Sequence, residues 1–386
     1  MDFGFFNELL RINSTSGKER KVAEWLAERL PGLFPASNQP ELRVDEVGDG
    51  TLNLLLTWGT PKLVFCSHLD TVPPYIPPTL SEDKIYGRGS CDAKGQVFAL
   101  VEACKKLSEE GCSDFGLLLL AGEETGSWGA KAFAKTDFKA EYLVVGEPTD
   151  NCMVSASKGT KSFDLKFTGV PFHSGYPQFG VSAVNLFVDF VNALKAKDFG
   201  MDPLLGETSW NIGLVHSDNP QNILSPELTC RLYFRTTFVS DEAVTAWMAD
   251  APNLLKDGRS QPAMTESKTS GSTTNILPDS TPSVIPGLTS PVIPGLTSPV
   301  IPGLTGNLTV TPRGGDTPAR YWTVEGLPSK SVAFGSDAPH LTNFQHKAIC
   351  GPGSITVAHR DDEHVRIADL ATAVDQYIAL YRAVMK

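Results

Sequence analysis

The sequence predicts an α/β protein whose larger unit has a mixed, mostly parallel sheet, with a smaller α+β unit inserted into it. In the first half, short apolar runs alternate with stretches whose apolar residues follow a helical spacing. Such alternation is typical of a parallel sheet covered by helices. After about residue 160, runs with one apolar and one polar face take over, as in an antiparallel sheet that is covered on one side.

The elements of the first half follow from these patterns in order. Apolar residues at helical spacing predict helices, and runs that are apolar throughout predict strands buried on both faces. The helices are expected over 21–30 and 95–107, and the strands over 63–66, 117–120 and 142–145. Functional residues of such sheets lie beyond the carboxyl ends of the strands, so the segments after these three runs are the first candidates for a site.

The second half predicts the order strand, helix, strand, strand, helix, strand, which is that of a ferredoxin-like unit. Its elements are expected around 163–167, 184–191, 210–215, 228–236, 244–251 and 308–310. The chain then returns to a buried-strand pattern at 331–334 and closes with a helix from Ile367 to Tyr381. We therefore expect a larger unit of residues 1–157 and 315–386 and an inserted unit of residues 158–314.

The segment 258–306 has a composition of its own. Val-Ile-Pro-Gly-Leu-Thr recurs at Val284, Val292 and Val300. Pro-Gly pairs favour turns and exclude regular helix. Because added length in a surface loop costs little closure entropy, we interpret the segment as an expanded loop rather than a binding element.

Composition narrows the range of partners. The formal net charge of −11 argues against binding to nucleic acid or an anionic membrane, since both require a basic surface. No apolar run is long enough to cross a bilayer, and the N-terminal residues lack the features of a signal peptide. The 7 cysteines form no CxxC pair, which is usual for reduced thiols. We expect a cytoplasmic protein.

Acidic residues and histidines gather directly after the predicted buried strands and before two of the helices. In chain order they are His68, Asp70, Asp92, Glu123, Glu124, Glu147 and His359. Several have an ordinary alternative, such as a helix N-cap for Asp92 or solvated loop acids for Glu123 and Glu124. Together they form a histidine and carboxylate set without cysteine, which suits Zn²⁺, Co²⁺ or Mn²⁺.

In their order and spacing, these segments resemble the M20 family of metallopeptidases and deacylases. The similarity extends over about residues 5–386 apart from 258–306, and its strings are Ser67–Pro73, Gly87–Gly95, Ala121–Gly126, Val145–Thr149 and Ala358–Glu363. The resemblance implies a di-metal enzyme with two divalent ions per chain, Zn²⁺ first and Co²⁺ as the alternative. It also implies a small-molecule substrate.

The resemblance assigns the metal ligands by position. His68 and Glu147 would hold one ion, Glu124 and His359 would hold the other, and Asp92 would bridge both.

Two further acids receive roles from the same resemblance. Asp70 would orient the ring of His68, and Glu123 would be the general base. A cis peptide would follow the bridging acid, at Asp92–Ala93.

The inserted unit resembles the family's lid and dimerisation domain around Gly169–Gly175. This implies a homodimer in which His173 reaches the active site of the partner subunit and stabilises an oxyanion. Arg235 would bind the substrate carboxylate, although pairing with acids of its own unit is the alternative. The remaining substrate contacts that the resemblance implies are Asn222, Gly335 and Ser336.

Overall, the sequence is most similar to the acetylornithine deacetylase branch, through 314–320 and 333–339. The expected function is a metal-dependent amidohydrolase that removes an acyl group from an N-acyl amino acid. The first expected substrate is N-acetylornithine, cleaved to ornithine and acetate in arginine biosynthesis. Alternatives in the family are a dipeptidase or carboxypeptidase and a deacylase of acetylcitrulline or succinyl-diaminopimelate; a catalytically inactive binding protein is the alternative from another class.

Overall fold

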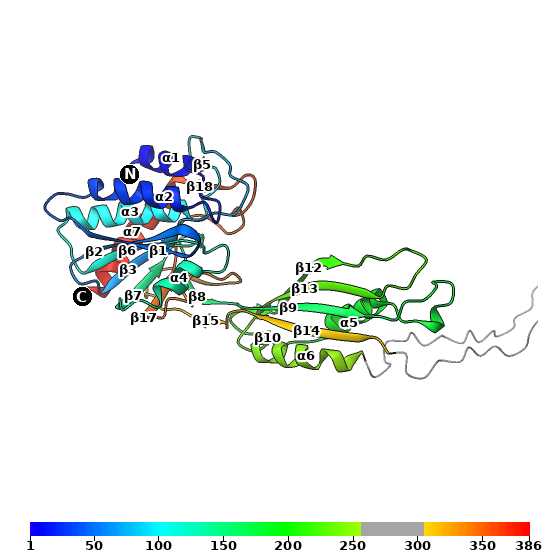
Figure 1. Cartoon of the computed structure of the whole chain (residues 1–386). Helices are drawn as coiled ribbons and strands as arrows, with labels where there is room; N and C mark the ends of the chain where they lie inside the picture. Colours follow the sequence, from blue (N-terminus) through cyan, green and yellow to red (C-terminus); the bar gives the residue numbers. More distant parts are fainter. Residues whose placement is uncertain (256–304) are drawn as a thin grey trace, which may run out of the picture.

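The computed structural model describes residues 1–255 and 305–386 of the chain. Figure 1 shows two units side by side, one built on a six-stranded sheet and the other on a four-stranded sheet. The predicted repeat loop at 258–306 lies almost entirely outside the described residues. Within the described part of the chain, no helix is long and apolar enough to span a membrane.

The sheet of the larger unit has the strand order β1-β2-β6-β3-β7-β17. Strand β3 pairs in parallel with β6 and β7, and β17 pairs in parallel with β7. Strands β1 and β2 form an antiparallel hairpin at one edge. The predicted mixed, mostly parallel sheet is therefore confirmed. The strands are β1 Glu41–Val47, β2 Thr51–Trp58, β3 Leu63–His68, β6 Phe115–Leu120, β7 Ala140–Val145 and β17 Phe344–Ile349.

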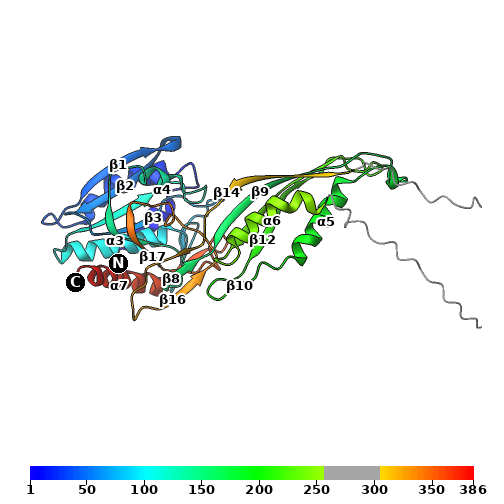
Figure 2. The same cartoon turned by 90° about the horizontal axis from the view of Figure 1, so that it is seen from below.

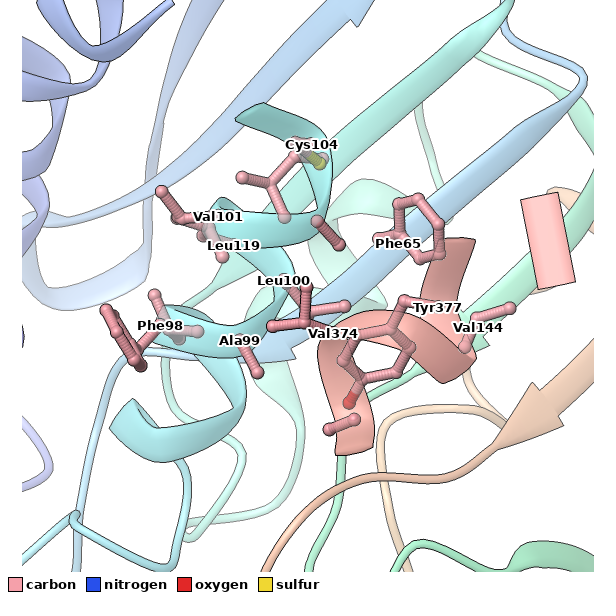
Figure 3. Packing of buried hydrophobic residues seen from close by; sticks show 14 of the residues in the cluster. Phe65, Phe98, Ala99, Leu100, Val101, Cys104, Leu119, Val144, Val374 and Tyr377 are labelled. Atoms are coloured by element: carbon pink, nitrogen blue, oxygen red, sulfur yellow. The ribbon is translucent and has the colours of Figure 1, made fainter. Parts of the chain in front are cut away.

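Both faces of this sheet are buried. Leu117 and Leu119 pack in the cluster that the larger helices cover, whereas Leu118 and Leu120 pack in a second cluster beneath α4. This two-sided burial explains why the central strands are apolar throughout. Figure 3 shows side chains of α3 packed against Phe65 and residues of α7. The helices are α1 Phe3–Arg11, α2 Arg20–Arg29, α3 Lys94–Glu109, α4 Trp128–Phe133 and α7 Ile367–Val384.

The smaller unit has an antiparallel sheet of order β12-β13-β9-β14. Helices α5 and α6 lie alongside this sheet (Figure 2). Their apolar residues and those of the sheet form a hydrophobic cluster that is separate from those of the larger unit. The element order is the predicted ferredoxin-like one, and the exact unit boundaries stay a prediction. The elements are β9 Gly159–Thr168, α5 Ala183–Ala196, β12 Ser209–His216, β13 Glu227–Thr236, α6 Asp241–Leu254 and β14 Asn307–Gly314.

Short elements complete the fold. The buried strand expected at 331–334 is found as β16 (Ser329–Val332), displaced toward the N-terminus and only partly buried. It belongs to a separate three-stranded sheet with β8 and β15, because it pairs in parallel along β8 rather than with a strand of the central sheet. The remaining elements are β4 Thr79–Leu80, β5 Lys84–Tyr86, β8 Met153–Ser157, β10 Met201–Asp202, β11 Gly206–Glu207, β15 Ala319–Arg320, β18 His364–Arg366, and the 3₁₀ turns η1 Leu30–Leu33, η2 Gly48–Gly50 and η3 Pro177–Phe179.

Candidate metal centre and active site

A pocket of about 280 Å³ is lined by residues of both units. Acids that follow β6 and β7 line one side, and residues of β9 and β13 line the other. The first group contains Glu123, Glu124 and Glu147, and the second contains Thr160, Tyr233 and Arg235. The parallel strands thus deliver the predicted acids to one edge of the sheet, where the smaller unit meets them.

Asp92 lies between two histidines at this pocket. Its Oδ1 is 3.1 Å from Nε2 of His68, and its Oδ2 is 3.3 Å from Nε2 of His359. Nε2 of His359 is also 2.9 Å from Oε1 of Glu124. Ligand atoms of His68, Asp92 and Glu124 all lie within 4.8 Å of one another. A carboxylate with one oxygen facing each imidazole has the arrangement of a bridging ligand, and the Asp92–Ala93 peptide is cis, as the resemblance implies.

Glu147 supplies an independent indication that a cation fits here. Its side chain is buried, and its Oε1 has no hydrogen-bond partner among the described residues. A buried carboxylate oxygen without a partner is costly, and a divalent ion beside it would remove that cost. Gly351 allows the chain to pack here, because a Cβ at that position would lie 2.7 Å from the carbonyl oxygen of Glu147. The donor set therefore fits a pair of divalent ions.

The charges of this cluster shift one another's pKa values. Hydrogen bonds to Asp92 and Glu124 raise the pKa of His359 to about 10. Burial opposes ionisation of Asp92, but the two imidazoles outweigh it and hold the pKa of that carboxyl well below its ordinary value. Burial, together with the carboxylates of Asp92 and Glu123, raises the pKa of Glu147 well above its usual range. Carboxylates packed this closely are typical of a site that holds cations.

Asp70 organises more of the site than the sequence indicated. Nδ1 of His68 lies 2.9 Å from the carbonyl oxygen of Asp70 and 3.4 Å from its Oδ1. The carboxylate also accepts the backbone N–H groups of Glu123 and Glu124, at 3.0 and 3.2 Å, and the hydroxyl of Ser16 at 2.8 Å. Asp70 therefore contacts the histidine, as expected, and in addition holds the loop that carries the two acids.

Glu123 is half-buried and lines the pocket. The turn that presents it needs glycine at position 122, where φ is +69° and a Cβ would collide with the indole of Trp128. Burial, reinforced by the carboxylates of Asp337 and Glu124, raises the pKa of Glu123 well above its ordinary value. A carboxyl with a raised pKa is suited to taking and returning a proton.

Some of the predicted substrate residues line the pocket, and others lie away from it. Gly335, Ser336 and Arg235 line the pocket. Arg231, which precedes Arg235 on β13, pairs with Asp164 of its own unit at 2.7 Å, which is the kind of contact that was the alternative for Arg235. For Arg235 the structure records no ion pair within the described residues; its guanidinium stacks 5.1 Å from the ring of Tyr233.

His173 and Asn222 lie away from this pocket. Thr160, near the start of β9, lines the pocket, and β9 then runs to Thr168 before the chain reaches His173. At about 3.3 Å per residue, this strand carries the chain roughly 25 Å. Both residues are exposed, and Ser174 donates its N–H to the carbonyl oxygen of Asn222 at 2.9 Å. The structure does not bring either residue to the pocket of its own chain.

Several pocket residues were missed by the sequence analysis. Lys131, Asp316 and His340 also line the pocket, and Nε2 of His340 is 3.5 Å from Oδ1 of Asp316. They come from three separate segments without a shared pattern. Two of them had a signal in the sequence: Asp316 lies within the segment 314–320, and His340 directly follows the segment 333–339, both of which carry the resemblance to the acetylornithine deacetylase branch.

Comparison with known proteins agrees with this geometry. The sequence model of Peptidase family M20/M25/M40 matches residues 64–290. A probable carboxypeptidase from Aspergillus terreus is 30% identical, over 99% of this chain and 86% of that protein.

Two solved structures have the same fold. A tripeptidase from Staphylococcus aureus has a TM-score of 0.73 at 20% identity, covering 99% of this chain and 97% of that one. A dinuclear metal-binding M20 peptidase from Bacillus subtilis has a TM-score of 0.65 at 8% identity, covering 99% of this chain and 96% of that one. These two structures show the fold, and the family model together with the fungal relative shows the family: the chain belongs to Peptidase family M20/M25/M40 and is a hydrolase of that family.

Proposed function

We propose that the protein is a metal-dependent peptidase that cleaves short peptides with a free C-terminal carboxylate. The proposal rests on the position of Arg235. Its guanidinium lines the same pocket as Asp92 and forms no ion pair with an acid among the described residues. The names of the relatives, a probable carboxypeptidase and a tripeptidase, support the peptidase alternative over the N-acetylornithine deacetylase in arginine biosynthesis that the sequence first indicated.

The ligand roles are part of the proposal. His68 and Glu147 would hold one ion, Glu124 and His359 the other, and Asp92 both, with Zn²⁺ as the first choice and Co²⁺ as the alternative. The support is that each oxygen of Asp92 faces a different histidine. When bound, such a pair of ions polarises the scissile carbonyl and lowers the pKa of water.

The chain's own residues would supply the remaining chemistry. Glu123 would take a proton from the attacking water at its carboxylate and return it to the leaving amine. Arg235 would hold the C-terminal carboxylate through two parallel N–H donors. Gly335 and Ser336 would form the adjoining wall of the pocket.

A substrate panel tests the proposal. We expect a dipeptide with a blocked N-terminus and a free carboxylate to be hydrolysed about 10- to 100-fold more efficiently than its C-terminal amide, because the amide loses a charge-assisted bond to Arg235. The panel should include unblocked tripeptides and N-acetylornithine, with kcat/KM measured for each. If acetate is released from N-acetylornithine faster than any peptide is cleaved, the protein is a deacetylase and the peptidase proposal is wrong.

We further propose a homodimer formed through the smaller unit. Strand β12 is an end strand of its sheet, and an uncovered edge is available for pairing. Exposed apolar side chains lie on this strand and near His173, with Leu214 71% and Tyr176 56% exposed. The cytoplasmic location stays a prediction of the sequence.

A further inference from the structure

We propose that Glu363 and Arg88 form a brace that sets the spacing between the loop carrying Asp92 and the loop carrying His359. Both would be positioning residues of the metal centre. The inference rests on the proposed metal ligands and goes beyond them, since neither Glu363 nor Arg88 faces the pocket.

Glu363 holds the backbone of the Asp92 loop. Its Oε1 accepts the N–H groups of Gly89, Cys91 and Asp92, at 2.9, 3.1 and 3.1 Å. The side chain is fully buried, so water does not compete for these bonds. Backbone N–H groups that converge on one anion form a fixed concave site, and here one of them belongs to the proposed bridging ligand itself.

Arg88 makes the reciprocal connection. Its Nη1 forms a buried ion pair with Oε2 of Glu363 and donates to the carbonyl oxygen of Arg360 at 3.2 Å. Its Nε donates to the carbonyl oxygen of Pro74 at 3.2 Å. Arg360 directly follows His359 in the chain. A side chain from the Asp92 loop therefore fixes the backbone beside His359, while Glu363 fixes the backbone of Asp92.

The His359 loop needs such support. His359 has a φ of +65°, which is uncommon for a residue other than glycine and persists where surrounding contacts determine it. The carbonyl of the next residue is held by Arg88, and the N–H of Gly87 donates to the carbonyl oxygen of Glu363 at 3.0 Å. A buried ion pair seldom adds stability over apolar residues of the same size, so geometry is the better explanation for this one.

Three variants separate positioning from stability. Glu363→Gln keeps the volume but turns an amide donor toward Arg88, and we expect it to weaken metal binding about 10- to 100-fold. Arg88→Met leaves Glu363 as an unpaired buried charge and should lower the melting temperature strongly. The double variant Arg88→Met/Glu363→Gln removes that charge, so we expect the melting temperature to recover while metal affinity stays low.

A matched control comes from the smaller unit, where Lys161 pairs with Asp241 at 2.8 Å and both side chains are largely buried. Lys161→Met should lower the melting temperature and leave metal affinity unchanged. Affinity for Zn²⁺ is measured on the full chain by competition with a chelator. Amide hydrogen exchange over 87–95 is measured without metal, and should be faster in Glu363→Gln than in the wild type.

The outcomes distinguish the brace from the metal centre. If the wild type binds two ions and Glu363→Gln binds them with the same affinity, the positioning role of Glu363 is wrong, while the proposed metal centre stands. Recovery of metal affinity together with melting temperature in the double variant would do the same, because the pair would then act only through stability. A wild type that binds no ion would overturn the metal centre and, with it, the role of the brace.

Discussion

Glu123→Gln is expected to lower peptide turnover by about 10²- to 10⁴-fold, the range typical of a lost general base, while both ions remain bound. Glutamine has the same shape but takes up no proton. The loop should keep its position, because it is the backbone N–H of Glu123, not its carboxylate, that bonds to Asp70. The loss should therefore appear in kcat rather than in metal content.

The measurement pairs kcat at saturating substrate with the number of metal ions per chain. Glu41→Gln, at the exposed start of β1, is the matched control and should behave as the wild type. Near-normal turnover in Glu123→Gln would show that the base assignment is wrong. Loss of metal from the variant would instead make Glu123 a ligand.

His173→Ala is expected to lower kcat by about 10²- to 10³-fold, the effect of removing one oxyanion donor, without a change in melting temperature. The side chain is exposed, and within residues 1–255 and 305–386 its ring accepts one hydrogen bond, from the nearby N–H of Gly175 at 3.0 Å. Its distance from the pocket of its own chain, on the order of the length of β9, excludes a direct role there. The expected effect therefore depends on a partner subunit.

Mixed dimers test that dependence. When His173→Ala and Glu123→Gln subunits are exchanged, half of the dimers should be hybrids with one complete site, restoring about a quarter of the wild-type activity. Each variant alone should stay inactive, and sedimentation should show a dimer. If the protein is a monomer, or if the hybrids have no activity, His173 does not act in the active site of a partner subunit.

The parts of the fold that were predictable from sequence are those fixed by local pattern. The runs at 63–66, 117–120 and 142–145 are apolar throughout because both faces of their strands are buried. Acids after those strands converge because parallel strands end at one edge of the sheet. The hairpin of β1 and β2 was missed, and β1 has a mostly exposed, irregular burial pattern that gives no periodic signal.

Contacts between distant segments could not be predicted in this way. Glu363 bonds to the N–H of Asp92, 271 residues away in the chain, and nothing in the spacing of the sequence indicates that pairing. The second task of Asp70, holding the loop of Glu123 and Glu124, is likewise a product of packing. For His173 the resemblance assigns a role in a partner subunit, which a single chain does not test.

Titration of the metal-stripped protein with Zn²⁺, with a peptide bearing a free C-terminal carboxylate as substrate, tests whether the protein is a peptidase that depends on two metal ions. We expect no hydrolysis before metal is added, a rise in rate with added Zn²⁺, and a plateau at two ions per chain. Full activity in the stripped protein would show that the reaction needs no metal, and a protein that binds two ions but cleaves neither peptides nor N-acyl amino acids would not be the proposed hydrolase.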